Sequence, residues 1–190
     1  SDFNRSLPRI SSRRGFERPG APHAPERLTQ STPLPGRPLV IPRNEHCISR
    51  RNIDEDALKV LRRLLRCGYR AFLVGGAVRD LLLGREPKDY DDGTDASPEE
   101  VRDLLRNSRA IGRRFRIIHV YFKGNKIIEV STFRDSVAAD TVDEQPTLAA
   151  DNTFGDPETD AVRRDLTING LFYDLSTFSV IDYVGGIKDL

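Results

Sequence analysis

The sequence predicts an α/β (α+β) fold, in which helices flank a small mixed or antiparallel sheet, preceded by a disordered N-terminal tail. Three observations support this. An amphipathic helical pattern over residues 54–66 leads directly into a short apolar run, residues 71–74. Two further pairs of strand-like runs follow, over residues 117–133 and 171–184. The 190 residues include 37% hydrophobic and 31% charged residues, which suits one core of ordinary size.

Residues 1–43 form the predicted tail, because they are rich in Pro, Arg, Ser and Gly and show no apolar periodicity. Such a segment cannot bury enough surface to offset its ordering entropy. Its eight arginines against three acidic residues also fit an arm that follows RNA phosphates, or an organellar transit peptide. We expect the folded domain to occupy residues 44–190.

The composition also indicates a compartment and excludes some classes of protein. No apolar run approaches the roughly 20 residues of a membrane span. Cys47 and Cys67 show neither a CxxC pattern nor metal-ligand spacing, which favours a reducing compartment such as the cytoplasm, or an organelle if the tail is a transit peptide. The chain contains no methionine, so we expect it to be a piece of a longer protein.

Three helices are predicted from their first residues. Over 54–66, leucines recur at helical spacing behind acidic residues, and Gly68 is a suitable stop. Ser97 followed by Pro98 and Glu100 has the pattern of an N-cap with a capping box. Asp156 before Pro157 indicates another helix start.

Strand pairs are predicted over 117–122 and 126–133, joined by a turn, and over 171–174 and 179–184. Between them, residues 134–153 have little periodicity and are predicted to form a long loop, which in a compact domain is often functional.

The first chemical signal is a strand, two glycines and a short helix. The apolar run 71–74 precedes Gly75 and Gly76, and residues 77–83 form the predicted helix. Glycine lets the backbone approach an anion, and Arg79 can pair with a phosphate through two hydrogen bonds. The alternative is an ordinary tight turn between a strand and a helix. The pattern is neither GxGxxG nor a Walker loop.

The second signal is the run Lys88-Asp89-Tyr90-Asp91. If it is a strand, Asp89 and Asp91 leave the same face about 7 Å apart, and a divalent cation between them would relieve their repulsion. Glu129, in an apolar stretch, would be a third carboxylate beside them. The alternatives are a solvated Asp-x-Asp turn and a solvated edge glutamate.

Two further stretches carry groups that suit a nucleotide or RNA. Residues 160–169 place Arg164, Asp165 and Asn169 close together, as would suit a triphosphate and a ribose; the alternative is a charged helix face. Residues 112–116 form a dense basic patch with one aromatic residue. Its arginines are Arg113, Arg114 and Arg116.

Taken together, three motifs resemble the head-domain signature of the class II nucleotidyltransferases, which include tRNA CCA-adding enzymes and bacterial poly(A) polymerases. They are the runs 73–80, 88–91 and 163–169, in this order. The resemblance covers about residues 41–190. The lead-in 41–50 and the run 112–120 resemble bacterial poly(A) polymerases, whereas CCA-adding enzymes usually carry a His-Gly-Thr type sequence near the latter position.

The resemblance implies transfer of AMP from ATP to an RNA 3′ end, with release of pyrophosphate. Asp89 and Asp91 would hold two Mg²⁺ ions, with Mn²⁺ as an alternative, and Glu129 would join them in catalysis. The predicted partners are ATP and RNA, and no membrane; the oligomeric state is open. The triphosphate would be bound by Gly75, Gly76, Arg79, Arg164, Asp165 and Asn169. The RNA or the triphosphate would contact Arg113, Arg114 and Arg116.

One departure from the family pattern affects the site. Where the family continues the strand after Asp91 with apolar residues, this chain has Asp92-Gly93. A buried acid there is destabilising unless paired, and glycine weakens a strand, so the strand is expected to end early or the metal site to be disturbed. RNA binding without catalysis on the same fold therefore stays open. CCA addition to tRNA also stays open, because CCA-adding enzymes share the head domain and its chemistry.

Overall fold

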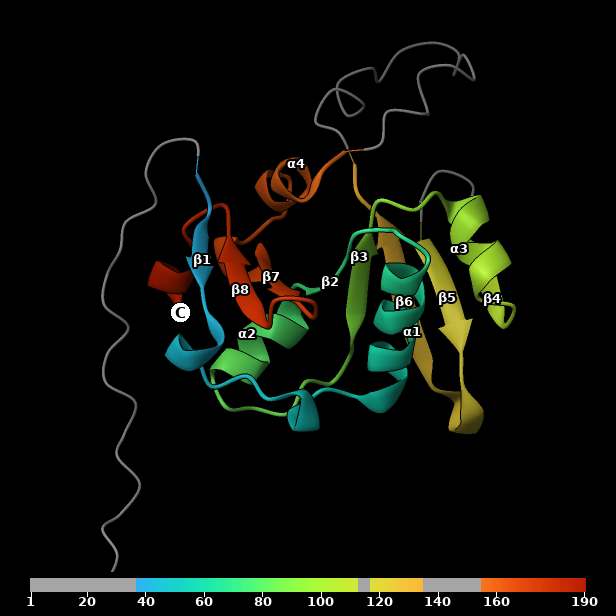
Figure 1. Ribbon diagram of the computed structural model, residues 1–190, viewed down its shortest axis with the longest axis horizontal. Coiled ribbons are helices and arrows are strands. Elements are labelled where there is room, and N and C mark those ends of the chain that lie inside the picture. Colours follow the sequence, from blue (N-terminus) through green and yellow to red (C-terminus); the bar gives the residue numbers. More distant parts are fainter. Residues whose placement is uncertain (1–36, 113–116, 135–154) are drawn as a thin grey trace, which may run out of the picture.

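A computed structural model describes residues 37–112, 117–134 and 155–190 (Figure 1). Four α-helices and eight strands lie within these ranges. The helices are α1 (Glu55–Arg66), α2 (Gly76–Leu82), α3 (Pro98–Leu104) and α4 (Pro157–Val162). The strands are β1 (Leu39–Ile41), β2 (Ala71–Val74), β3 (Asp91–Thr94), β4 (Ser108–Ile111), β5 (Ile117–Tyr121), β6 (Ile127–Thr132), β7 (Leu171–Asp174) and β8 (Ser179–Asp182). Short 3₁₀ turns include η1 (Arg43–Glu45), η2 (Arg50–Asn52), η3 (Lys123–Asn125), η6 (Thr167–Asn169) and η7 (Gly186–Asp189).

The eight described strands form one sheet in the order β1-β8-β7-β2-β3-β6-β5-β4. Only β3 and β6 pair in parallel among them, so the sheet is mixed, as the sequence predicted, although it is larger than expected. The parallel pair is central to the site, because it sets Asp91 opposite Glu129.

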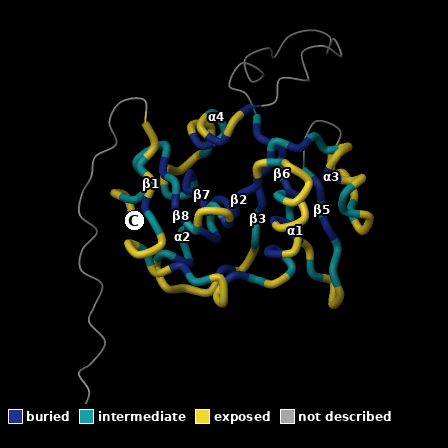
Figure 2. The backbone as a smooth tube through the Cα atoms, in the orientation of Figure 1, coloured by how far each residue is buried: buried dark blue, intermediate teal, exposed yellow. Residues whose placement is uncertain are grey.

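One face of the sheet carries the main core, which α1, α2 and α3 cover (Figure 2). The buried face of α1 includes Leu58, Leu61 and Leu64, spaced at three and four residues, and it packs against β2 and β3. These apolar contacts hold the central strands in place from one side.

The opposite face divides into two parts. Beside α4, an aromatic cluster contains Phe72, Phe133 and Phe172, with ring centroids 5.9–6.2 Å apart. Further along, the same face of β6, β5 and β4 is only partly covered, since burial alternates along β5 and β6. The candidate site lies between the cluster and this open part.

The predicted helix starts are confirmed. The side chain of Asp54 accepts hydrogen bonds from the backbone of α1, and Ser97 and Asp156 each form a capping box. Gly68 has φ +91°, the left-handed conformation expected after a helix end. Local side-chain patterns therefore located these helices correctly.

Two predictions about boundaries, and one alternative interpretation, were wrong. The described chain is already ordered before residue 44, because β1 pairs with β8. The alternative interpretation of residues 160–169 as a charged helix face does not hold either, since α4 ends at Val162 and η6 follows. Asp89 precedes β3, which begins at Asp91 and continues through Asp92-Gly93 instead of ending there. Pairing with β2 on one side and β6 on the other overrides the weak strand propensity of Asp92-Gly93.

Cys47 and Cys67 are both free and exposed. In the part of the chain that the structure describes, no helix is both long and apolar enough to cross a membrane.

Candidate active site

Asp91 and Glu129 form the centre of the candidate site. The register of the parallel strands places the two residues opposite each other, and the backbone N–H of Glu129 donates to the carbonyl of Tyr90 at 3.4 Å. Burial, and then the negative charge of Glu129, raise the pKa of Asp91 to about 6; the cation of Arg164 lowers it and Asp89 raises it further. These carboxylates are therefore close enough to repel one another.

Asp89 lies at the edge of this group. It is exposed and lines a surface hollow of about 970 Å³ together with Lys88 and Lys126. The prediction that the two aspartates leave the same face of one strand was wrong, since only Asp91 is in β3. Their electrostatic coupling is nevertheless present.

Arg164 is the cation that faces the carboxylates. Its Nη2 lies 2.9 Å from Oδ2 of Asp160, one helical turn earlier, and its guanidinium carbon lies 5.7 Å from the centre of the Phe172 ring. Both contacts restrict the guanidinium, while its Nε is buried without a hydrogen-bond partner among the described residues.

Gly75 is needed where these groups meet. Its backbone has φ +72° and ψ −137°, a conformation that glycine adopts readily. A Cβ added there would lie 3.1 Å from Nη1 of Arg164 and 4.0 Å from Oδ2 of Asp91. The N–H of Gly75 already donates to the carbonyl of Leu171 at 3.1 Å. Gly75 therefore allows the guanidinium of Arg164 to approach the backbone closely, and it does not offer its own donor as a phosphate cradle would suggest.

Arg79 is held by two partners on the other side of Gly75. Its Nη1 donates to Oδ1 of Asn169 at 2.9 Å, and its Nε donates to Oδ1 of Asp80 at 2.9 Å. A Cβ on Gly76 would lie 3.6 Å from Nη2 of Arg79, so the guanidinium is folded back over the start of α2. The structure thus brings Arg79 and Asn169 together, as the motifs predicted.

The position of Asn169 depends on a close backbone contact that the sequence did not reveal. A Cβ on Gly186 would lie only 2.2 Å from the carbonyl oxygen of Thr167, which begins η6. The carboxylate of Asp182 accepts hydrogen bonds from the N–H groups of residues 184–187 and fixes that turn. The sequence feature that could have indicated this contact is Gly185-Gly186, for which no role was predicted.

The structure says less about the other predicted site residues. Asp165 is exposed, and no described residue forms a hydrogen bond or ion pair with it. Arg113, Arg114 and Arg116 lie outside the described residues. Sequence reasoning missed the contributions of Asp160 and Phe172 to the position of Arg164, because these contacts depend on the fold.

The carboxylates suit a hard divalent cation. No group of three His, Cys, Asp or Glu side chains in the described ranges is close enough to form a metal cage by itself. Mg²⁺ does not need one, because it is commonly bound by one or two carboxylates together with substrate phosphates and water. Burial and the negative charges of Glu129 and Asp89 disfavour the ionised form of the Asp91 carboxyl, and a cation there would relieve that repulsion.

Comparison with known proteins gives the same family as the motifs. Residues 71–190 match the family model described as the poly A polymerase head domain. The chain is 55% identical over 158 residues to poly(A) polymerase I of Escherichia coli, which covers 80% of this chain and 34% of that protein. The chain thus spans about a third of the length of this relative.

Two solved structures that resemble the chain are a CCA-adding enzyme and a tRNA nucleotidyltransferase. The CCA-adding enzyme of Bacillus stearothermophilus in complex with CTP is 36% identical with a TM-score of 0.58, and the match covers 70% of this chain and 30% of that one. A tRNA nucleotidyltransferase complexed with a primer tRNA and an incoming ATP analog is 30% identical with a TM-score of 0.51, covering 68% of this chain and 36% of that one.

Proposed function

The chain belongs to the poly A polymerase head-domain family, and on this premise we propose that it carries the catalytic site of a polynucleotide adenylyltransferase. The 3′-hydroxyl oxygen of an RNA strand forms a bond to the α-phosphorus of ATP. The bond from that phosphorus to the bridging oxygen breaks, pyrophosphate leaves and the hydroxyl proton is released. Repetition of this step would lengthen an RNA tail without a template.

The arrangement of charge supports this reaction. Asp91 and Glu129 lie opposite each other in paired strands, and Arg164 faces Asp91 from the end of α4. Asp89 and Asp91 would hold Mg²⁺, which supplies positive charge for the triphosphate and a lower pKa for the RNA hydroxyl. Glu129 is the third carboxylate of the site.

The groups around Gly75 would hold the triphosphate. Arg79 and Arg164 are both fixed by side-chain partners, so little side-chain entropy would be lost when they bind an anion. Because Gly75 has no side chain, the guanidinium of Arg164 and the carbonyl of Asn169 both lie close to its backbone. Asp165, exposed after α4, is proposed to contact a ribose hydroxyl.

The single observation that carries the proposal is the pair Asp91 and Glu129 facing a restrained arginine beside Gly75. The nearest alternative is CCA addition to tRNA, since the solved structures that resemble the chain are tRNA-processing enzymes. RNA binding without catalysis is the alternative from another class, and buried Asp92 is the feature that favours it.

The test is incorporation of labelled ATP and CTP by the full-length protein with Mg²⁺, on an oligo(A) primer and on a tRNA without its CCA end. We expect long A-tails on the primer and little use of CTP. Two C additions followed by one A on the tRNA would establish the CCA-adding alternative. No incorporation on either substrate by a folded protein would favour the binding alternative.

A further inference from the structure

A row of polar side chains leads from the carboxylates to the edge of the sheet. Register pairs Asp91 with Glu129, Glu129 with His119, and His119 with Arg109. Residues directly opposite each other in paired strands point to the same face, so the row crosses β3, β6, β5 and β4 on the open face. At the usual strand spacing, Arg109 lies about 10 Å from Glu129.

Contacts join the members of this row. Nε2 of His119 lies 3.3 Å from Oε2 of Glu129. The His119 ring also meets the Tyr121 ring edge to face, with centroids 6.3 Å apart. Since Tyr121 is two residues after His119 on the same strand, both rings lie on the open face. The row therefore offers two adjacent aromatic rings next to a catalytic carboxylate.

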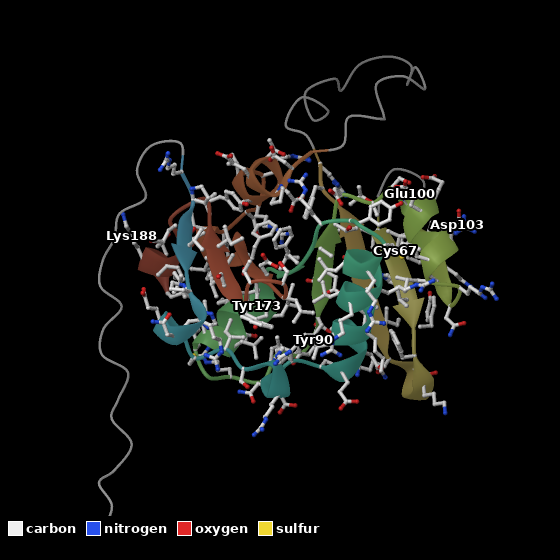
Figure 3. All side chains as sticks on the ribbon, in the orientation of Figure 1. Cys67, Tyr90, Glu100, Asp103, Tyr173 and Lys188 are labelled. Atoms are coloured by element: carbon white, nitrogen blue, oxygen red, sulfur yellow. The ribbon has the colours of Figure 1, made fainter. Side chains whose placement is uncertain are left out.

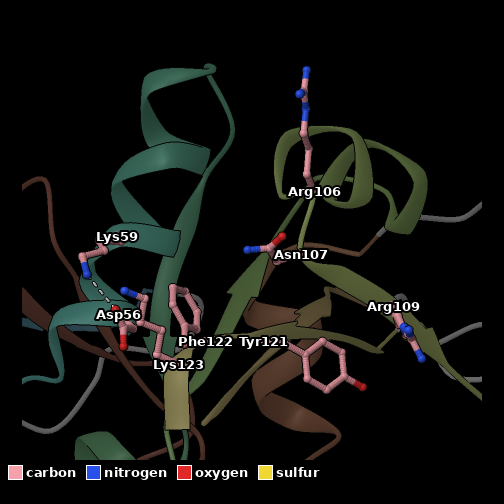
Figure 4. Close-up of a pocket in the computed structure, with 8 residues that line it drawn as sticks. All are labelled: Asp56, Lys59, Arg106, Asn107, Arg109, Tyr121, Phe122 and Lys123. Carbon is pink, nitrogen blue, oxygen red and sulfur yellow. Dashed lines mark hydrogen bonds and ion pairs between the residues drawn. The ribbon is translucent and has the colours of Figure 1, made fainter. Parts of the chain in front are cut away.

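At the sheet edge, Arg109 and Tyr121 also line a basic hollow of about 1090 Å³, which extends around the edge to α1 on the other face (Figure 4). It is lined by Asp56, Lys59, Arg106, Asn107, Arg109, Tyr121, Phe122 and Lys123. The acid of this set, Asp56, is already paired with Lys59 at 2.7 Å and with Lys126 at 3.0 Å. Arg106, Arg109 and Lys123 are exposed and have no ion-pair partner among the described residues. The hollow thus carries uncompensated positive charge.

We propose that this surface, from His119 and Tyr121 to Arg109 at the edge of the sheet, binds the 3′-terminal single strand of the RNA primer. This proposal rests on the proposed function, because it takes the RNA 3′ end to lie at Asp91 and Glu129. Aromatic rings on which bases stack, followed by cations that meet phosphates, are the features of sites for single-stranded nucleic acid. Charge complementarity favours RNA over an apolar or basic protein segment as the occupant.

Site-directed cross-linking tests the path of the strand. Oligo(A) RNA carrying one photoreactive nucleotide at a chosen distance from the 3′ end is irradiated with the full-length protein, and the cross-linked peptide is identified by mass spectrometry. We expect the peptide with His119 and Tyr121 when the nucleotide lies close to the 3′ end, and its loss when the nucleotide is moved far upstream. Cross-links that never reach this peptide would overturn the proposal.

Substitutions test the energetics. We expect Tyr121→Ala to weaken oligo(A) binding about five- to tenfold and Tyr121→Phe to preserve it. Arg109→Ala should also reduce the slope of log affinity against log salt by about 0.7, the value for one phosphate contact to a single strand. The control is Lys188→Ala, which removes an exposed charge at the opposite edge of the sheet (Figure 3) and should change neither quantity.

The outcomes separate this proposal from the proposed function. Thermal unfolding of each variant first identifies any that does not fold, and Arg109→Lys then supplies a variant with the charge kept. Equal RNA affinity in wild type, Tyr121→Ala and Arg109→Ala would overturn the proposed RNA-binding surface even if AMP transfer is observed. RNA binding that depends on these residues, in a protein without AMP transfer to RNA, would support the surface and contradict the proposed function.

Discussion

Two buried aspartates have opposite environments in this molecule. The carboxylate of Asp182 accepts hydrogen bonds from four backbone N–H groups and stabilises the turn that follows β8. Asp92 is also fully buried, opposite Leu73 and Val130, but neither of its oxygens has a hydrogen-bond partner in the described structure. Burial, with the charge of Asp91 next, raises its pKa well above the usual value. Asp92 is therefore a destabilising group in the core, as the sequence indicated, although it does not end the strand.

We expect Asp92→Val to raise the free energy of unfolding by about 1–3 kcal/mol at pH 7, because it removes an unsatisfied polar group and keeps a similar volume. Denaturant unfolding of the two proteins measures the difference. Asp182→Val is the matched control and should be destabilising, since it removes a carboxylate that is fully hydrogen-bonded. A loss of stability in Asp92→Val would show that the Asp92 carboxyl is paired in the native protein.

The pH dependence of this difference follows from the direction of the pKa shift. A carboxyl whose pKa is raised on folding binds its proton more tightly in the folded state, so stability is lost as pH rises above the unfolded value of 3.8. The stability gap between Asp92→Val and wild type should widen from about pH 4 towards neutral, by at most about 1.4 kcal/mol per pH unit. Unfolding curves across this range measure it, and a gap independent of pH would mean that folding does not raise the pKa of Asp92.

At the scale of elements, signals that act within a few residues were read correctly from the sequence. The caps at Ser97 and Asp156 depend only on hydrogen bonds to the next turn of helix, and both formed as predicted; Asp54, predicted as the first residue of its helix, is also an N-cap. The start of β3 and the existence of β1 were missed, because each depends on pairing with strands distant in the sequence. The approach of η7 to η6 was missed for the same reason.

We expect Gly186→Ala to be destabilising by about 1–3 kcal/mol and to weaken ATP binding, because the added Cβ would push the backbone of Thr167 away and move Asn169 with it. Thermal unfolding and ATP titration of the full-length protein measure the two effects. Gly84→Ala is the control: its φ of +68° makes alanine unfavourable there, but no atom lies within 4 Å of the added Cβ. It should lose stability without losing ATP affinity. Unchanged ATP affinity in a folded Gly186→Ala would contradict the role assigned to η6.

At the scale of the whole molecule, the fold assembles a site from motifs that are far apart in the chain (Figure 1). The sequence predicted which residues belong together, since the motif order resembles one family. It could not predict that Arg164 faces Asp91 or that His119 touches Glu129. Nor could it predict that Gly75 makes room for Arg164 while its own N–H is already bonded to Leu171. These arrangements follow from the sheet order and from the close packing of η6, and neither is encoded in a local pattern.

The most direct test of the assigned chemistry is the rate of AMP transfer from ATP to oligo(A) by full-length Asp91→Asn, with wild type and Asp103→Asn beside it. Asp91→Asn keeps the shape of the side chain and removes its charge from the centre of the site. Asp103→Asn makes the same change on α3, where the residue is exposed (Figure 3). We expect the rate to fall at least about a thousandfold in Asp91→Asn and to stay at the wild-type value in Asp103→Asn. A folded Asp91→Asn that transfers AMP at the wild-type rate would contradict the assignment of this site.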